Sequence, residues 1–471
     1  PMQLHHRYAT ELAETVSAVK PQPLSEMSMP MYNRELAAQF KLPDSDALMS
    51  AIFDEGGELA ANAVAQKYGG HQFGQWNPFL GDGRGLLLGE VSNDQGNSYD
   101  LHLKGAGQTP YSRHADGRAV LRSTLREYIA SEALHHLRIP TSRALCLITS
   151  EQSIVRELPE PGAMMIRMAP SHIRFGHFEF YYHNKQKDTL DKLMQYTLTH
   201  HFPECLKDAN PHKALLTAIT LRTARMVALW QAYGFVHGVM NTDNMSIHGI
   251  TFDYGPYAFI EHFQSDAVFN HSDYEGRYAF DRQPGIALWN LNALAYAFSD
   301  HLSTDDIRAC LTLFEPTFLS QYRLQMLSRI GLEDNAENEP CLNTWLSLLS
   351  AEKRDYTQSF RQLITADPQQ ESVPLRDQFV DRNAFDNWWQ DYRKRRIAAG
   401  TANEALYALN PLVIPRTHYL QSAIDAAEQG DFGPAHKLME AIRQPFDDNE
   451  ITREYSQPGA ASSQGSLSCS S

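Results

Sequence analysis

The chain is 471 residues long and carries 41 Lys and Arg against 56 Asp and Glu, which gives a formal net charge of −15. Its composition, 42% hydrophobic and 21% charged, excludes a largely disordered protein. The acidic balance argues against a general nucleic-acid or anionic-membrane binder, because both recruit basic surfaces. We therefore expect no nucleic-acid partner and no membrane partner, and any phosphate must be bound by a few cations inside a cleft.

The five cysteines are scattered and form no CxxC pair, which excludes a disulfide-dense secreted scaffold and a zinc ribbon. No apolar run approaches the ~20 residues that a membrane helix needs. The polar residues 1–20 contain no signal-peptide core. These features predict a cytoplasmic protein.

The N-terminal part of the chain changes character near residue 66. Residues 1–65 mix short helical patterns with proline-rich breaks, and we expect an N-terminal extension there. A glycine-dense stretch at 67–85 then leads into an apolar run at 86–91, and residues 99–104 alternate in strand fashion. This pattern predicts a glycine loop within an antiparallel hairpin, followed by a strand that ends at Lys104.

Helical patterns dominate the rest of the chain. Residues 121–137 carry apolar side chains at helical spacing, which predicts a long helix containing Glu127. Two or three short strand-like runs follow, up to about residue 168. From about residue 189 to 442 the pattern is mostly helical, with a loop-and-strand insert rich in Asn and Asp at 235–257.

This order of elements predicts an α+β chain with a bilobal protein-kinase-like fold and a helical C-terminal extension. Beyond the N-terminal extension we expect a kinase-like N-lobe over 66–168, a kinase-like C-lobe over 169–300, a helical extension over 301–455 and a flexible, serine-rich tail over 456–471.

Four features with a shared chemistry occur in kinase order: a glycine loop, Lys104 on a strand, Glu127 on a helix, and Asn244 followed nine residues later by Asp253. Glycines allow backbone amides to approach phosphate oxygens. Lys104 supplies a compact cation that Glu127 can hold. Asn244 and Asp253 supply hard oxygen ligands for Mg²⁺ or Mn²⁺. Each match alone is more often a turn or a solvated charge, but their order and spacing favour a kinase-like nucleotide site.

Departures from kinases are equally informative. Val239 occupies the position of the kinase catalytic aspartate, and an apolar side chain cannot deprotonate an acceptor hydroxyl. Asp243 is the nearest carboxylate and the natural substitute base. The glycine loop carries Arg84, and Arg167 and Arg174 add two more guanidinium groups. These cations would neutralise much of a bound triphosphate, so ordinary kinase geometry is doubtful.

Long, distinctive motifs lie between residue 67 and the C-terminus. They read KYGGHQFGQW (67–76), LKGAGQTPYSR (103–113), ADGR (115–118), HGVMNTDN (237–244), DYGP (253–256), NHSD (270–273), GRYAF (276–280) and CSS (469–471). In these motifs the chain strongly resembles the selenoprotein O family, from about residue 65 to its end. The resemblance implies a pseudokinase that binds ATP in a flipped orientation. It also implies transfer of AMP to Ser, Thr or Tyr hydroxyls of proteins, with release of pyrophosphate.

The resemblance also assigns roles to individual residues, with ATP as co-substrate. It implies a Lys104–Glu127 ion pair in the catalytic machinery, Asp243 as proton acceptor, and Asn244 and Asp253 as ligands of Mg²⁺ or Mn²⁺. The residues that it places on the nucleotide are Gly81, Gly83, Arg84, Lys104, Asp116, Gly117, Arg167 and Arg174. Arginines that hold the terminal phosphates deep in the cleft would leave the α-phosphate facing the acceptor.

One position departs from the family. Phe269 stands where members often carry a cysteine able to pair with a C-terminal one. Cys469 therefore lacks its expected partner, which puts a regulatory disulfide in doubt.

Three alternatives remain beside AMP transfer. A protein uridylyltransferase using UTP and Mn²⁺ differs only in contacts to an outward-facing base, which the sequence does not place. Val239 and Arg84 argue against a conventional kinase. The intact set of Lys104, Glu127 and the acidic residues of the loops argues against a non-catalytic nucleotide-binding scaffold. Acceptor proteins and oligomeric state are left open.

Overall fold

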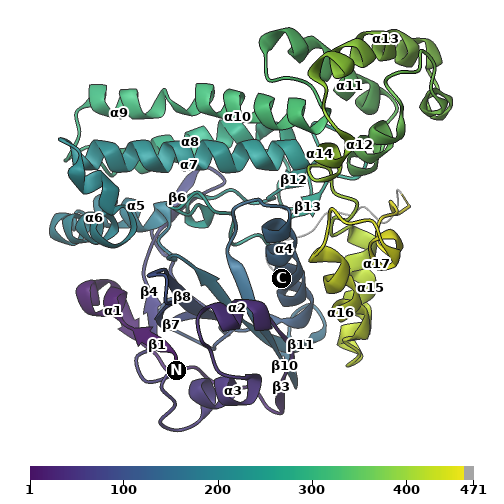
Figure 1. The fold of residues 1–471 in the computed structure, drawn as a ribbon. Coiled ribbons are helices and arrows are strands. Elements are labelled where there is room, and N and C mark those ends of the chain that lie inside the picture. Colours follow the sequence, from purple (N-terminus) through teal and green to yellow (C-terminus); the bar gives the residue numbers. More distant parts are fainter. Residues whose placement is uncertain (461–471) are drawn as a thin grey trace.

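One lobe of the protein is built on an antiparallel sheet. The computed structural model describes residues 1–460, and Figure 1 shows the sheet below a layer of long helices. Its main path runs in the order β2 (Val16–Ala18), β4 (Val64–Gln66), β7 (Gly85–Ser92), β8 (Ser98–Lys104), β11 (Pro159–Ala169), β10 (Arg143–Val155) and β3 (Met27–Tyr32). Two strands lie off this path, β1 (Gln3–His5) beside β7 and β9 (Ala119–Val120) beside β11.

The strands on either side of Lys104 behave as the alternation predicts. β7 and β8 form an antiparallel hairpin whose register places Gly85 opposite Lys104, the last residue of β8. The strand-like runs expected after the long helix are β10 and β11. Both strands extend beyond the apolar segments that predicted them, and they pair along most of their length. Their outer ends are exposed and polar, so apolar pattern alone did not reveal them.

The first 65 residues are part of this same sheet. β1 pairs with β7 and β3 pairs with β10, so the boundary expected near residue 65 coincides with no break in strand pairing. α1 (Arg7–Glu11) follows β1, whereas α2 (Arg34–Gln39) and α3 (Ser45–Phe53) lie between β3 and β4; all three are shown in purple in Figure 1. The side chains of Asn33 and Asp44 cap α2 and α3 by accepting backbone N–H groups.

One helix of this lobe, α4 (Leu121–His136), packs against β10 and β11. The predicted apolar positions Leu125, Tyr128 and Ile129 are buried in the core. Glu127 is also buried, although a glutamate is almost never fully buried without a partner. Its partners lie in the site described below.

The second lobe is helical. Its core is formed by α5 (Phe175–His183), α6 (Lys187–His201), α7 (Pro211–Tyr233) and α8 (Gln283–Tyr296). α7 ends at Gly234, whose φ of +79° suits glycine at a helix C-terminus. The loop-and-strand insert expected at 235–257 follows. It contains β12 (Phe235–Val236), the short 3₁₀ turn Thr242–Asn244 and β13 (Ala258–Phe259).

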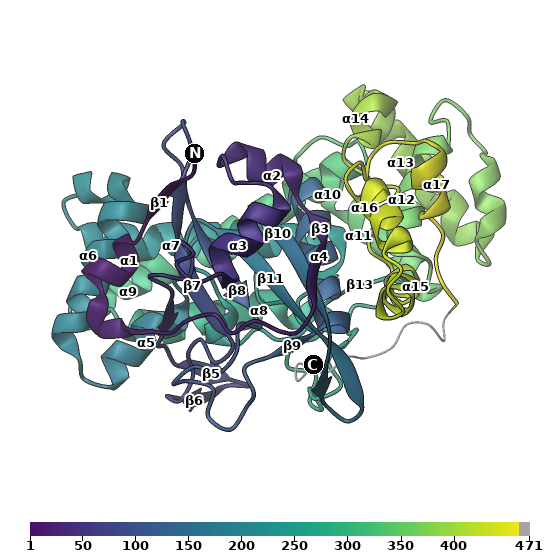
Figure 2. The same cartoon turned by 90° about the horizontal axis from the view of Figure 1, so that it is seen from below.

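The remaining helices cover both lobes. They are α9 (Thr304–Leu311), α10 (Phe314–Arg329), α11 (Glu339–Ala351), α12 (Tyr356–Thr365), α13 (Arg382–Ala399), α14 (Asn403–Tyr407), α15 (Thr417–Glu428), α16 (Gly433–Ile442) and α17 (Glu450–Glu454). α9 and α10 pack along α7, whereas α15 and α16 pack against α4 (Figure 2). The extension therefore joins the helical lobe to the helix that carries Glu127.

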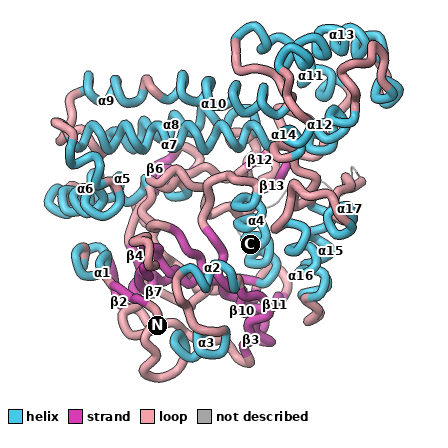
Figure 3. Tube along the Cα trace, viewed as in Figure 1, coloured by secondary structure: helices cyan, strands magenta, loops and turns pink. Residues whose placement is uncertain are grey.

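The α+β, bilobal organisation with a helical extension is confirmed, and Figure 3 shows the large sheet on one side and the long helices α7 to α10 on the other. No helix among residues 1–460 is long and apolar enough to cross a bilayer. Cys469, and most of the tail that the sequence predicts to be flexible, lie outside the described residues.

Candidate active site

A cavity of about 770 Å³ opens between the sheet lobe and the helical lobe. Its walls come from the loop before β7, the end of β8, α4, β11 and the insert that follows α7. It is lined by every residue predicted to handle nucleotide, metal or proton: Gly81, Gly83, Arg84, Lys104, Asp116, Gly117, Glu127, Arg167, Arg174, Asp243, Asn244 and Asp253. Val239 lines it too.

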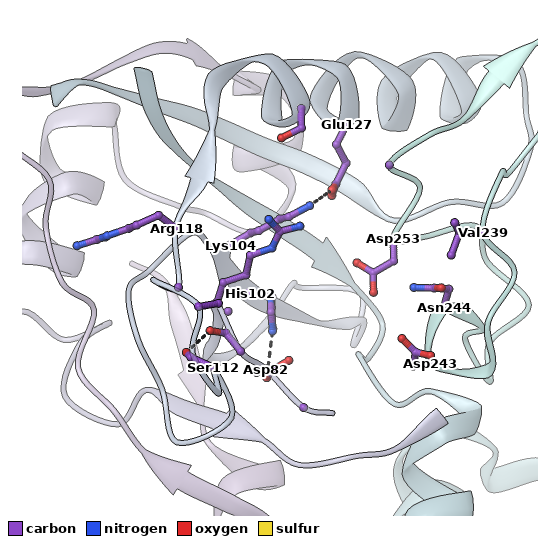
Figure 4. A pocket seen from close by; sticks show the side chains of 18 of the residues that line it. Asp82, His102, Lys104, Ser112, Arg118, Glu127, Val239, Asp243, Asn244 and Asp253 are labelled. Atoms are coloured by element: carbon purple, nitrogen blue, oxygen red, sulfur yellow. Dashed lines mark hydrogen bonds and ion pairs between the residues drawn. The ribbon is translucent and has the colours of Figure 1, made fainter. Parts of the chain in front are cut away.

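The strand lysine and the helix glutamate form a buried ion pair (Figure 4). Lys104 Nζ lies 2.6 Å from Glu127 Oε1, and the two side chains are 15% and 3% exposed. Burial lowers the pKa of Lys104, although Glu127 opposes this change. Burial alone would raise the pKa of Glu127, but Lys104 and Arg167 outweigh it and hold that pKa below its usual range. The Glu127 carboxylate is therefore charged at neutral pH.

Asp253 is held by two arginines that come from different elements. Arg167 lies on β11 and Arg174 is the residue before α5, and each uses Nη1 to contact one carboxylate oxygen of Asp253. Arg167 also approaches Glu127 Oε2 at 3.5 Å. Burial would raise the pKa of Asp253, but the two arginines and Lys104 hold it well below the usual range. Positive φ, +55° at Asp253, marks backbone strain of the kind that clusters at functional sites.

Two glycines at the cavity are required by the backbone. Gly81 has a φ of +140°, and a Cβ there would lie 2.9 Å from the carbonyl oxygen of Gln66. Gly117 has a φ of +72°, and its Cβ would lie 2.1 Å from the carbonyl oxygen of Gly107. Both positions therefore admit only glycine, which keeps side chains away from this wall of the cavity.

Asp243 combines burial with an unused oxygen. It is 8% exposed, and burial raises its pKa to about 7, with Arg174 opposing the shift only in part. Its Oδ1 has no hydrogen-bond partner among the described residues. A carboxyl group that titrates near neutrality is suited to general-base chemistry at physiological pH. Gly70 packs directly against it, since a Cβ there would lie 2.4 Å from Asp243 Oδ1.

The oxygen donors beside the cations of the cavity fit a hard divalent ion. Asn244 Oδ1 is buried and has no hydrogen-bond partner within residues 1–460, and the Asp253 carboxylate lines the same cavity. Within residues 1–460 no group of three or more His, Cys, Asp and Glu side chains is placed to hold a metal alone. Mg²⁺ bound to nucleotides needs only one or two carboxylates, because phosphates and water supply its other ligands. The donor set therefore fits a magnesium or manganese ion shared with a nucleotide.

A small hairpin that the sequence analysis did not resolve supports the catalytic loop. β5 (Gly70–Gln72) pairs with β6 (Gln75–Asn77) across Phe73 and Gly74, both with positive φ. The backbone N of His71 donates to Thr242 Oγ1 at 2.6 Å, and that of Phe73 donates to Asn241 Oδ1 at 3.0 Å. A two-residue loop in which both residues have positive φ is typical of a tight hairpin. The sequence did not reveal this hairpin, because its loop lies within a glycine-dense stretch.

Histidine and aspartate residues on β8 were also missed. Asp100, His102 and Lys104 occupy alternate positions and so share one face of the strand. His102 lines the cavity, and its Nε2 lies 3.2 Å from Asp82 Oδ2 (Figure 4). The same alternation that located Lys104 points to these two residues, but it does not say what they contact.

Similarity to known proteins extends over nearly the whole chain. Residues 2–443 match the family described as "Protein adenylyltransferase SelO". Bacterial relatives named "Protein nucleotidyltransferase YdiU" are 49% identical over 97% of both chains in Pseudoalteromonas atlantica and 44% identical over 95% of both chains in Erwinia tasmaniensis. The relative of that name in Pseudomonas aeruginosa is 46% identical over 95% of this chain and 94% of its own.

Among solved structures, ROP2 from Toxoplasma gondii is described as a virulence factor with a protein-kinase fold and no enzymatic activity. It is 13% identical, with a TM-score of 0.26 over 58% of this chain and 80% of its own. A likeness this slight carries no weight beside the elements described above.

Proposed function

The chain belongs to the SelO family of protein adenylyltransferases and is a nucleotidyltransferase, and from that premise we propose that it transfers AMP from ATP to Ser, Thr or Tyr hydroxyls of other proteins. One observation supports this most. A single cavity is lined by several cationic side chains, Arg84, Lys104, Arg167 and Arg174 among them, together with a carboxyl group, Asp243, whose pKa is raised to about 7.

The four cations would bind the terminal phosphates of ATP. Guanidinium groups match phosphate oxygens with pairs of N–H donors, and Lys104 adds a point charge. With the β- and γ-phosphates against the arginines, the α-phosphate faces the acceptor. Pyrophosphate is then the leaving group, and its developing charge is stabilised by cations that are already in place.

Asp243 is the proton acceptor in this proposal. The acceptor hydroxyl oxygen forms a bond to the α-phosphorus, the bond from that phosphorus to the bridging oxygen of the β-phosphate breaks, and the hydroxyl proton passes to the Asp243 carboxylate. Val239, which lines the cavity at the kinase aspartate position, has no atom that can take this proton.

Asn244 and Asp253 would hold the divalent ion, which neutralises phosphate charge and orients the α-phosphate when bound. In the structure, both oxygens of Asp253 contact arginines. Nucleotide binding with metal therefore exchanges one set of ion pairs for another: the arginines turn to phosphate and Asp253 turns to metal. No buried charge is left unpaired in this exchange. Leaving one unpaired would cost several kcal/mol.

Label tracing tests the reaction. The protein is incubated with Mg²⁺ and with ATP labelled at either the α- or the γ-phosphate, and label in protein is measured. We expect label from the α-position only, and labelling about 10²-fold slower with the Asp243→Ala variant. Label from the γ-position only would mean a kinase reaction, and label from neither would favour a nucleotide-binding scaffold. Parallel reactions with α-labelled UTP and Mn²⁺ decide between AMP and UMP as the group transferred.

A further inference from the structure

A buried histidine, His172, accepts a hydrogen bond from Arg167 on the side of the guanidinium that faces away from the cavity. Arg167 Nε donates to His172 Nε2 at 3.2 Å, while Arg167 Nη1 contacts Glu127 and Asp253 on the cavity side. The other ring nitrogen of His172, Nδ1, lies 2.9 Å from Asp100 Oδ2. The same Asp100 oxygen accepts the backbone N–H of His172 at 2.9 Å. A carboxylate, an imidazole and a guanidinium therefore lie in one hydrogen-bonded line.

The chemistry of arginine fixes the protonation of this line. A guanidinium offers only donors, so His172 Nε2 must be the acceptor and Nδ1 must carry the proton. Nδ1–H then donates to Asp100, which selects this tautomer. Burial, reinforced by His102, lowers the pKa of His172 well below its usual range, so the ring stays neutral and able to accept.

Neighbouring groups keep the His172 ring in place. His102 stacks on it with ring centroids 4.5 Å apart and planes inclined by 20°. In strand register Asp100 lies opposite Glu90, which accepts the backbone N–H of Tyr8 at 3.1 Å. His172 is 1% exposed, so its ring has little freedom to turn.

We propose that His172 and Asp100 are positioning residues for Arg167, which orient its guanidinium so that the Nη groups face the nucleotide phosphates. A planar guanidinium whose Nε–H is committed to His172 can present only its terminal nitrogens to a ligand. The inference rests on the proposed function, because an oriented Arg167 matters only if it holds phosphate. The alternative is a purely structural role, in which the hydrogen bonds of His172 contribute only to the stability of the fold.

Two substitutions at His172 separate these readings. In His172→Gln the amide reaches the position of Nε2 and retains an acceptor for Arg167, but it loses the donor to Asp100. In His172→Asn the amide retains a donor near Nδ1 but does not reach Arg167. Asp100→Ala adds a third case, because it removes the oxygen that accepts both Nδ1–H and the backbone N–H of His172, and so leaves the ring free to turn away from Arg167. The chain also offers a control: His248→Asn removes a histidine whose Nε2 hydrogen-bonds to Ser171, the neighbour of His172.

The measurements are the Kd for ATP–Mg²⁺ by calorimetry, kcat and KM for AMP transfer, and Tm. We expect His172→Asn and Asp100→Ala to weaken ATP binding and to lower kcat/KM by about tenfold, the effect of losing one hydrogen bond to a charged group. We expect His172→Gln to stay within about threefold of the wild type in Kd, and His248→Asn to match the wild type. Tm does not track this order if the role is positioning, because both His172 variants lose one buried contact.

Equal losses in Kd for the Gln and Asn variants, or no loss in either, would overturn the proposal. If His172→Asn does not fold, Asp100→Ala decides, and an unchanged Kd in that folded variant overturns the proposal. Failure of the proposed function is distinguishable, because a wild-type protein that binds ATP but transfers no AMP still yields the series of Kd values.

Discussion

The protein contains two buried clusters of arginines and carboxylates that look alike in composition but differ in charge and surroundings. In the cleft, Lys104, Arg167 and Arg174 meet only Glu127 and Asp253, and Arg84 lies nearby. In the extension, Arg416 alone meets two carboxylates. Its Nη1 lies 3.0 Å from Glu261 and 2.7 Å from Asp355, and its side chain is 0% exposed.

The difference teaches which cluster serves a ligand. The cleft has an excess of positive charge that lines a cavity, so its cations have capacity left for an anion. The extension cluster, which we call the Arg416 clamp, has an excess of negative charge, and none of its three residues lines the cleft cavity. Its role is to join α12 and α15 to the segment after β13. Buried ion pairs therefore indicate a ligand site here only where positive charge exceeds negative charge and the cluster lines a cavity.

The largest effect is expected from Lys104→Ala. Loss of this cation removes phosphate stabilisation in the transition state, so kcat should fall by about 10³-fold, the upper end for one electrostatic group. The fold should persist, because Glu127 keeps Arg167 as a partner. Steady-state transfer rates and Tm check both statements; a Tm that collapses together with activity would place Lys104 with the structural cluster instead.

Arg416→Ala should do the reverse. It leaves Glu261 and Asp355 buried without their counter-ion, which costs about 3 kcal/mol of unfolding free energy. Denaturant unfolding measures this loss, and calorimetry on the folded variant should return the wild-type Kd for ATP. A variant with weakened ATP binding but wild-type stability would erase the distinction between the two clusters.

Asp243→Ala tests the base within the cleft. We expect kcat to fall by about 10²-fold, typical of losing a general base, while KM for ATP changes little. In the wild type, kcat should rise as pH increases through about 7, where the carboxyl loses its proton, and this rise should vanish in Asp243→Asn. A fall in ATP affinity without a fall in kcat would assign Asp243 to binding.

The stability of the fold also depends on the protonation of Asp243, but it falls as the pH rises, whereas kcat increases. Because the folded-state pKa of Asp243 is raised, the stability it contributes is fully present below the usual carboxyl pKa of 3.8 and is lost as the pH rises through about 7. Asp243→Asn should therefore gain stability relative to the wild type at pH 8 but not at pH 4. Denaturant midpoints at the two pH values measure this difference.

Gly70→Ala gives the smallest effect. The added methyl group would displace Asp243, so kcat should fall by about tenfold while unfolding free energy changes by about 1 kcal/mol. Gly285→Ala on α8 is a matched control, because a Cβ there meets nothing within 4 Å. Equal kcat values for the two variants would show that the β5–β6 hairpin does not hold the base.

How far the sequence anticipated this molecule depends on the distance between partners. Lys104 and Glu127 lie on adjacent elements with clear periodicity, so local pattern located both. Nothing in spacing says that Arg167 and Arg174 converge on Asp253, although the sequence grouped both with the cations expected to neutralise a triphosphate. His172 and Asp100 are 72 residues apart and were not foreseen.

The fold shows the same limit. β1, β2 and β4 are three residues each, too short for alternation to be visible, so the sequence indicated only an N-terminal extension over 1–65 and did not show that this segment joins the sheet. α4 and α7 carry long, buried apolar faces and were visible in sequence. Strand pairing is a long-range choice, which local pattern cannot specify for such short segments.

The orientation of the nucleotide is the central claim, and a crystal structure with a non-hydrolysable ATP analogue and Mn²⁺ tests it most directly. The account predicts the terminal phosphates against Arg167 and Arg174, and the α-phosphate as the phosphate nearest Asp243. A γ-phosphate nearest Asp243, with the adenine ring buried beside Arg167 and Arg174, would contradict the account.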